Sequence, residues 1–206
     1  MKPITTILEA KDRGFDPGPF VKDDVYFKKF YQSHKELIEN HNGLYAFDRA
    51  LHIFGFSEML GFHDIKTRNL PMEWRLLYGN AVDGLIFFAE EVFGNLFAYD
   101  NSGNIVLLNV ESAEIELVLE DFDEWMEYIT EDIDYTTGKV LAQEWAASNG
   151  QIPFGSHLCP KKPFIIGGEY EIDNLYVLSW EKSLLFKADI ARQIRDLPDG
   201  TDVILE

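Results

Sequence analysis

The chain has 206 residues, of which 46% are apolar and 14% aromatic, so it can bury a substantial core and is not globally disordered. Its formal net charge of -18 argues against nucleic acid and anionic membrane surfaces as partners, because both are bound through clustered Lys and Arg. A solvated acidic surface is the simplest explanation of this charge, and a basic protein partner is the alternative.

The cysteine content and the N-terminus indicate a compartment. Cys159 is the single cysteine, which excludes an internal disulfide and a cysteine-rich metal site. The stretch from Met1 to Asp12 lacks the continuous apolar segment of a signal peptide, and no other run is long enough to span a bilayer. We therefore expect a cytoplasmic protein. The length predicts a single domain over residues 1–206.

Helices are expected before the first strong strand signals. Asp24–Asn40 predicts an amphipathic helix, because its aromatic and aliphatic residues fall largely on one face. An N-terminal helical segment is therefore expected over about residues 1–42. The apolar spacing of Gly43–Gly55 fits either a short helix or an extended piece. Pro71–Gly79 predicts a short helix that begins near a proline and ends at a glycine.

The middle of the chain predicts a meander of four strands. The apolar runs Leu85–Ala89 and Asn95–Tyr99 are rich in aromatic and branched residues and are bounded by turn formers. Ile105–Val110 and Ile115–Leu119 follow after short turns, the first of them at Asn101–Asn104. Such short connections require antiparallel neighbours. The predicted fold class is α+β, with a mainly antiparallel central sheet flanked by helices.

The rest of the chain, about residues 130–206, is expected to elaborate this unit. Phe122–Ile129 predicts an amphipathic helix with Asp121 as its N-cap. The later elements predicted in chain order are a helix over Gly138–Ser148, a proline-rich loop over Ile152–Pro163, a strand over Asn174–Trp180, a helix capped by Ser183 that ends at Ile194, and a short strand over Val203–Leu205.

No catalytic motif is found in the sequence. The five histidines lack partners at zinc-ligand spacing, so we expect no metal site. Cys159 with His157 as its base is disfavoured, because residues two apart do not readily form the required hydrogen bond. A nucleophile elbow, a P-loop and a dinucleotide-binding glycine motif are all missing. We therefore predict no catalytic residue and no cofactor.

Glu90 and Glu91 interrupt the apolar run, and a charge there is costly unless it is exposed or paired. An acid/base pair with another carboxylate is one interpretation. The simpler one is a hairpin turn that places both side chains in water, since Gly94 and Asn95 lie nearby.

The clearest polar feature is an acidic block over residues 111–134, because no Lys or Arg occurs between Arg75 and Lys139. Either it is a solvated face with helix caps, or it is a docking surface for a basic protein. The residues chosen as candidate partner contacts are Glu90, Glu91, Glu120, Asp121, Asp123, Glu124, Glu127 and Glu131.

Several segments in order resemble the SMI1/KNR4 (SUKH) superfamily. They are Trp74 with Tyr78-Gly79, the run from Gly84 to Ala89, Phe93-Gly-Asn-Leu-Phe-Ala-Tyr-Asp100, the hairpin at Gly103 and Phe122-Asp-Glu-Trp125. Gly43–Phe47 and Pro198-Asp-Gly200 are compatible with bacterial members. The resemblance is good from Gly43 to Ile129 and loose elsewhere.

The resemblance implies an α+β domain that acts by binding protein and not by catalysis. Bacterial members are immunity proteins that bind and block a cognate toxin, often a nuclease. An acidic protein that covers the phosphate-gripping site of a basic toxin is physically reasonable. Two alternatives stay open: a regulatory scaffold or adaptor, and a carboxylate-dependent hydrolase with Glu90 or Glu91 in a deep pocket.

Overall fold

The computed structural model of the chain describes residues 2–198 and 201. Six strands form one antiparallel sheet in the order of the sequence. They are β1 (Leu44–Ala46), β2 (Leu51–Ile53), β3 (Ile86–Glu91), β4 (Leu96–Tyr99), β5 (Ile105–Leu108) and β6 (Ile115–Leu119). The predicted α+β class and the meander of β3 to β6 are therefore confirmed, and the β1–β2 hairpin extends the meander at the β3 edge.

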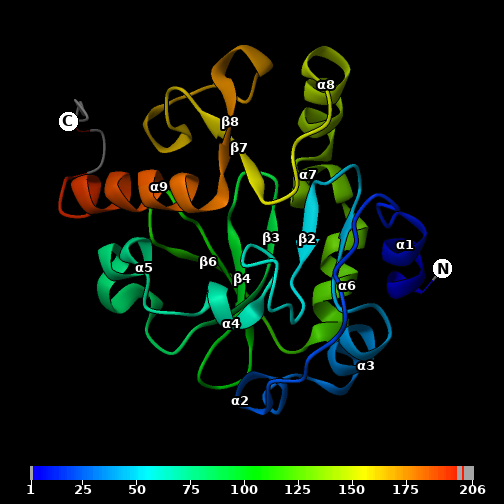
Figure 1. Cartoon of the computed structure of the whole chain (residues 1–206). Helices are drawn as coiled ribbons and strands as arrows, with labels where there is room; N and C mark the ends of the chain where they lie inside the picture. Colours follow the sequence, from blue (N-terminus) through cyan, green and yellow to red (C-terminus); the bar gives the residue numbers. More distant parts are fainter. Residues whose placement is uncertain (1, 199–200, 202–206) are drawn as a thin grey trace.

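Helices cover both faces of this sheet (Figure 1). On one side lie α1 (Pro3–Glu9), α3 (Gln32–His41) and α6 (Phe122–Glu131), with α1 and α3 packed against α6. On the other side lie α4 (Ile65–Arg68), α5 (Glu73–Tyr78) and α9 (Trp180–Ile194), with α5 packed against α9. Each helix contributes an apolar stripe, as surface helices of globular proteins do.

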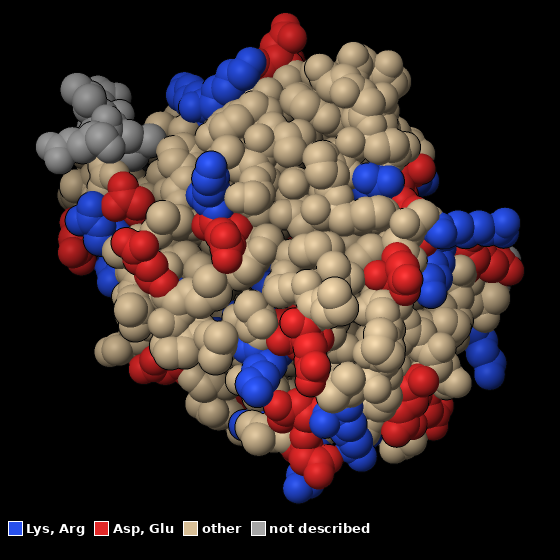
Figure 2. All heavy atoms as spheres, viewed as in Figure 1, with Lys and Arg blue, Asp and Glu red and all other residues tan. Residues whose placement is uncertain are grey.

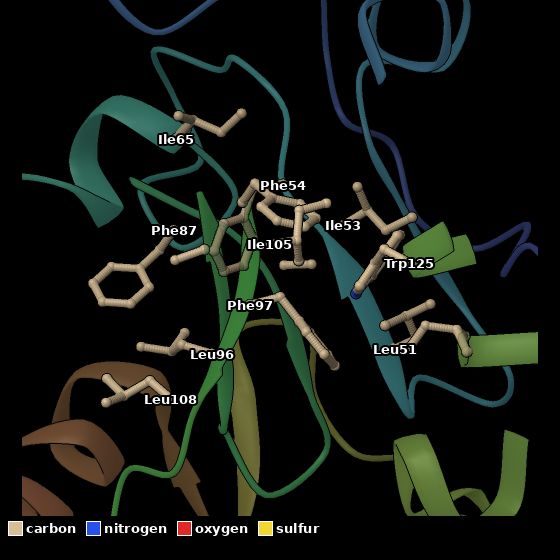
Figure 3. Packing of buried hydrophobic residues seen from close by; sticks show 14 of the residues in the cluster. Leu51, Ile53, Phe54, Ile65, Phe87, Leu96, Phe97, Ile105, Leu108 and Trp125 are labelled. Atoms are coloured by element: carbon tan, nitrogen blue, oxygen red, sulfur yellow. The ribbon is translucent and has the colours of Figure 1, made fainter. Parts of the chain in front are cut away.

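Alternation along the strands divides the core between the two faces of the sheet. Phe97 packs its ring edge-on against Trp125 of α6, at a centroid distance of 5.5 Å. Phe87 points the other way and meets Trp74 of α5 at 5.7 Å. The two groups are separated by the sheet in Figure 3. Both faces of the central strands are thus buried, which explains their nearly continuous apolar sequence.

The predicted helix over Asp24–Asn40 is wrong in its middle. The chain forms α2 (Asp24–Phe27) and α3, and Tyr31 between them is extended, with φ -62° and ψ 159°. The break lets the Tyr31 hydroxyl donate to the carbonyl oxygen of Glu120 at 2.7 Å. It also lets Phe30 stack on Tyr99 at 5.4 Å. Tertiary packing here overrides helical propensity.

The ambiguous stretch Gly43–Gly55 adopts the extended alternative, as strands β1 and β2. Phe47, Asp48 and Arg49 between them all have positive φ. The short helix expected over Pro71–Gly79 is present as α5, followed by the 3-10 turn η1 (Gly79–Val82).

The C-terminal part builds a second, smaller sheet. After α7 (Ile133–Thr137) and α8 (Lys139–Asn149), β7 (Ser156–Pro160) pairs antiparallel with β8 (Leu175–Ser179). The two strands are joined through η2 (Phe164–Ile166) and η3 (Ile172–Asn174). The predicted loop over Ile152–Pro163 is therefore wrong in its middle, where Ser156–Pro160 pairs with a strand that lies beyond two 3-10 turns.

The helices and strands expected over residues 138–148 and 174–180 are present as α8 and β8. The assignment of Ser183 as a helix cap is wrong. Helix α9 begins at Trp180 after Ser179, and Ser183 lies fully buried within it. The strand predicted over Val203–Leu205 lies outside the described residues.

Candidate functional site

The sequence indicated a solvent-exposed turn at Glu90, but the structure places this residue elsewhere. It lies within β3, 3% exposed, and its two oxygens contact three basic side chains. Oε1 is 2.9 Å from Nδ1 of His52, and Oε2 is 3.0 Å from Nε2 of His157. Arg68 of α4 donates to Oε2 as well. The charge inside the apolar run is therefore paired and not hydrated.

These contacts extend into a longer buried chain, here called the Glu90 network. His52 Nε2 contacts His63 Nδ1 at 2.9 Å, and on the other side His157 Nδ1 contacts the Ser183 hydroxyl at 2.9 Å. The Cys159 thiol donates to the same hydroxyl at 3.1 Å. The network therefore connects β2, α4 and β3 with the C-terminal elements β7 and α9.

The hydrogen-bond pattern fixes the number of protons near Glu90. His63 Nε2 donates to the carbonyl oxygen of Asn42 at 2.7 Å, so His63 Nδ1 accepts from His52 Nε2. His52 Nδ1 then faces Glu90 Oε1, and one proton must lie between these atoms. Burial, followed by the nearby charges, lowers the pKa of His52 well below its usual value.

The arrangement Ser183–His157–Glu90 has the residue types of a hydrolytic triad, but it is enclosed. The exposed fraction is 0% for Ser183, 2% for His157 and 0% for Cys159. A substrate would have to open the core to reach the hydroxyl or the thiol. The same burial removes the exposure on which Glu90 was chosen as a partner contact. We therefore expect the network to stabilise the fold.

Glu91 faces the opposite side of β3, as the alternation of a strand requires. It too is buried, at 6% exposed, so its predicted position in water is wrong. Its oxygens accept from the backbone amides of Phe93 at 2.9 Å and Asn95 at 2.8 Å, which fixes the β3–β4 turn. Burial raises the pKa of Glu91 to about 7.

Glu91 lines a hollow of about 560 Å³ that opens to the surface between α6, α7, α8 and the end of the main sheet. A smaller hollow of about 180 Å³ adjoins it. Phe93, Asn95, Asn109 and Tyr170 line both, and we call the two together the Tyr170 groove. The other residues around the larger hollow include the acids Glu116 and Asp134 and the aromatic residues Tyr128 and Tyr135.

Exposed aromatic rings distinguish this groove from the rest of the surface. Tyr135 is 82% exposed and Tyr170 60%, although rings of this size usually bury most of their area. Exposed rings beside carboxylates are typical of sites that bind cationic or amphipathic groups. These tyrosines could not be selected from the sequence, because the groove joins segments that are far apart in the chain.

The predicted contacts on α6 divide into two kinds. Asp121 accepts from the Glu124 amide at 2.9 Å, and Glu124 accepts from the Glu120 amide at 2.6 Å, so these two acids cap the helix. Asp123, Glu127 and Glu131 are exposed, and within the described residues their side chains form no hydrogen bond or ion pair. Only Asp123, Glu127 and Glu131 can therefore contact a partner protein without loss of the helix cap.

Basic residues scarcely neutralise the acidic block. In the part of the chain that the structure describes, Asp134 is its one member with an oxygen within 4 Å of a Lys or Arg nitrogen, at 3.9 Å from Lys139. By contrast, Lys and Arg side chains lie among Asp and Glu over the face shown in Figure 2. The block therefore contributes an uncompensated negative surface beside the Tyr170 groove.

The described residues contain no group of three His, Cys, Asp or Glu side chains able to hold a metal ion. Among the helices of residues 2–198, none combines the length and apolar content that a bilayer crossing needs.

Comparison with known proteins adds a family and a fold. Residues 28–128 match the model of the SMI1 / KNR4 family (SUKH-1). No curated protein matches the chain. Among solved structures, the chain is similar to the crystal structure of Atu4351 from Agrobacterium tumefaciens, with a TM-score of 0.52 and 10% sequence identity, over 85% of this chain and 84% of that one. At this identity the likeness shows a shared fold alone.

Proposed function

Residues 28–128 belong to the SMI1/KNR4 (SUKH) superfamily, and from this premise we propose that the chain is a non-enzymatic protein-binding domain of the immunity type. It binds and blocks a basic toxin domain of a bacterial polymorphic or contact-dependent system. It acts in the cytoplasm of the cell that it protects.

One observation carries this proposal: α6 presents three exposed acids without basic partners, and its Tyr128 lines the Tyr170 groove together with Glu116 and the exposed ring of Tyr135. Interfaces are enriched in aromatic residues, and complementary charge accelerates association. The residues of the Glu90 network, the alternative location for chemistry, are closed to substrate. A binding role therefore uses the open region, and a stabilising role accounts for the closed one.

The experiment uses as candidate partner the C-terminal domain of a large secreted protein whose gene neighbours that of this chain, produced with its activity disabled. Asp123, Glu127 and Glu131 are changed together to Lys, because none of them caps the helix or bonds another side chain. We expect the dissociation constant to rise by about tenfold or more, since like charges then face each other, and its dependence on salt to weaken.

The matched control reverses three exposed acids elsewhere, Glu39, Glu58 and Asp83, so that the net charge changes equally. We expect this variant to retain its affinity and its ability to rescue cells that express the active toxin. Equal weakening by both variants would show a long-range charge effect in place of a contact. Unchanged affinity of the α6 variant would exclude α6 from the interface.

A further inference from the structure

The smaller hollow of the Tyr170 groove contains a carboxylate that is only partly satisfied. Glu111 is 5% exposed, and its Oε2 accepts from the backbone amide of Ile165 at 2.9 Å. Its Oε1 has no hydrogen-bond partner within the described part of the chain. An unpaired buried acceptor costs free energy, so buried polar atoms are normally paired. This buried oxygen lacks a donor, which a group that enters the hollow beside it would supply.

The walls of the hollow are aromatic. Phe164 and Tyr170 stack with centroids 3.9 Å apart and ring planes at 6°. Phe93 meets both rings edge-on, at 5.3 Å and 5.7 Å. A carboxylate among stacked aromatic rings offers a cation both charge and a π face. Because Tyr170 is largely exposed, an entering group reaches this cluster from solvent.

The charges around the hollow are not balanced. The buried Lys187 donates to the carbonyl oxygen of Phe93, and its charge acts on both Glu91 and Glu111. One ammonium thus faces two carboxylates. Burial raises the pKa of Glu111, while the Ile165 amide and then Lys187 oppose that rise. The surplus negative charge is compensated either by a proton or by a cation from outside.

We propose that the smaller hollow binds an arginine side chain of the partner, with Glu111 Oε1 as its acceptor and the Phe164–Tyr170 stack as the surface against which the guanidinium lies. Arginine fits better than lysine, because its planar group stacks on rings while it donates to a carboxylate in the same plane. The inference rests on the proposed function and names the side chain by which the partner would be held in the groove.

A pair of small probes tests this without the toxin. The full chain, labelled with ¹⁵N, is titrated with Nα-acetyl-arginine methylamide and separately with the citrulline analogue, which has the same shape without the charge. We expect the arginine probe to shift the amide signals of Glu111, Ile165 and Tyr170, and to bind about tenfold more tightly than citrulline, as loss of a charged hydrogen bond implies.

Variants then assign the effect to Glu111. Glu111→Gln should abolish the preference for arginine over citrulline, while Glu114→Gln, at an exposed acid of the same segment, should retain it. Tyr170→Ala, at an exposed ring, should weaken binding of both probes and decides the matter if Glu111→Gln does not fold. Equal affinity for the two probes, or shifts confined to other parts of the chain, would overturn the proposal.

The outcome is separable from that of the toxin experiment. Probe binding without toxin binding would keep the arginine site and remove the immunity role. Toxin binding that survives Glu111→Gln, with no selectivity for the arginine probe, would keep the immunity role and remove this anchor.

Discussion

Glu90 and Glu91 are neighbours in one strand, yet they belong to two regions with opposite properties. Glu90 faces the closed region, where His52, His157 and Arg68 surround its carboxylate. Glu91 faces the open region, the Tyr170 groove, where carboxylates outnumber cations. Strand alternation alone separates them. A buried acid whose two oxygens both contact basic side chains contributes to stability, whereas a buried acid beside a surplus of negative charge is available for binding.

The variant with the largest expected loss of stability removes the Glu90 carboxylate, and it tests the contrast between the closed and the open region. Glu90→Ala leaves Arg68 buried among Phe54 and Trp180 without its counter-ion. We expect the free energy of unfolding to fall by about 3–5 kcal/mol, as when one partner of a buried ion pair is lost. Denaturant titration at neutral pH measures the change.

The control for this variant is Glu127→Ala, at an exposed acid of α6, which should change stability by no more than about 0.5 kcal/mol. If the two variants were equally stable, the Glu90 network would not contribute to the free energy of unfolding. The division into a stabilising closed region and a binding open region would then be wrong.

The second test concerns Glu91 and pH. Its pKa is raised by burial to about 7 in the folded protein, so the native state holds a proton that the unfolded chain has already released above its usual pKa of 4.5. The stabilisation by this proton is complete below pH 4.5 and is lost as the pH rises through 7. The loss is about 1.4 kcal/mol for each pH unit in that interval.

We expect Glu91→Gln to lack this trend, so the difference in unfolding free energy between wild type and variant should change steadily between pH 5 and pH 7 and level off above pH 8. Comparing the two proteins cancels the histidines, whose lowered pKa values act in the opposite direction. Parallel stability curves would show that Glu91 titrates as an ordinary exposed acid.

The sequence predicts the parts of the fold that depend on local patterns and misses those that depend on distant contacts. The strands β3 to β6 were predictable, because long apolar runs separated by short turns leave one pairing scheme. Strand β7 was not, since its partner β8 follows after η2 and η3, and pairing at that distance leaves no local pattern. The break at Tyr31 was equally hidden, because hydrogen bonds to Gly103 and Glu120 determine it.

The site is less predictable than the fold for a related reason. Whether Glu90 lies in water or in the core depends on Arg68 and His157, which are distant in sequence. Glu111 was visible only as one acid of a charged block, and its burial depends on the Ile165 amide. A carboxylate within an apolar run can indicate a buried basic side chain that pairs with it. The sequence offers this signal at Glu90.

The smallest test separates stability from binding on α6 itself, at the rim of the open region. Asp121 caps the helix by accepting from the Glu124 amide, so Asp121→Ala should lower the free energy of unfolding by about 1 kcal/mol. Asp121→Asn, which keeps an accepting oxygen at the cap, should restore most of this loss. Thermal unfolding of the two variants beside wild type measures both effects.

If Asn failed to restore stability, the negative charge at the helix N-terminus, and not the hydrogen bond, would be the stabilising feature. In that case the acids of α6 would support the fold through their charge, and the clean separation between a stabilising closed region and a binding open region would not extend to this helix.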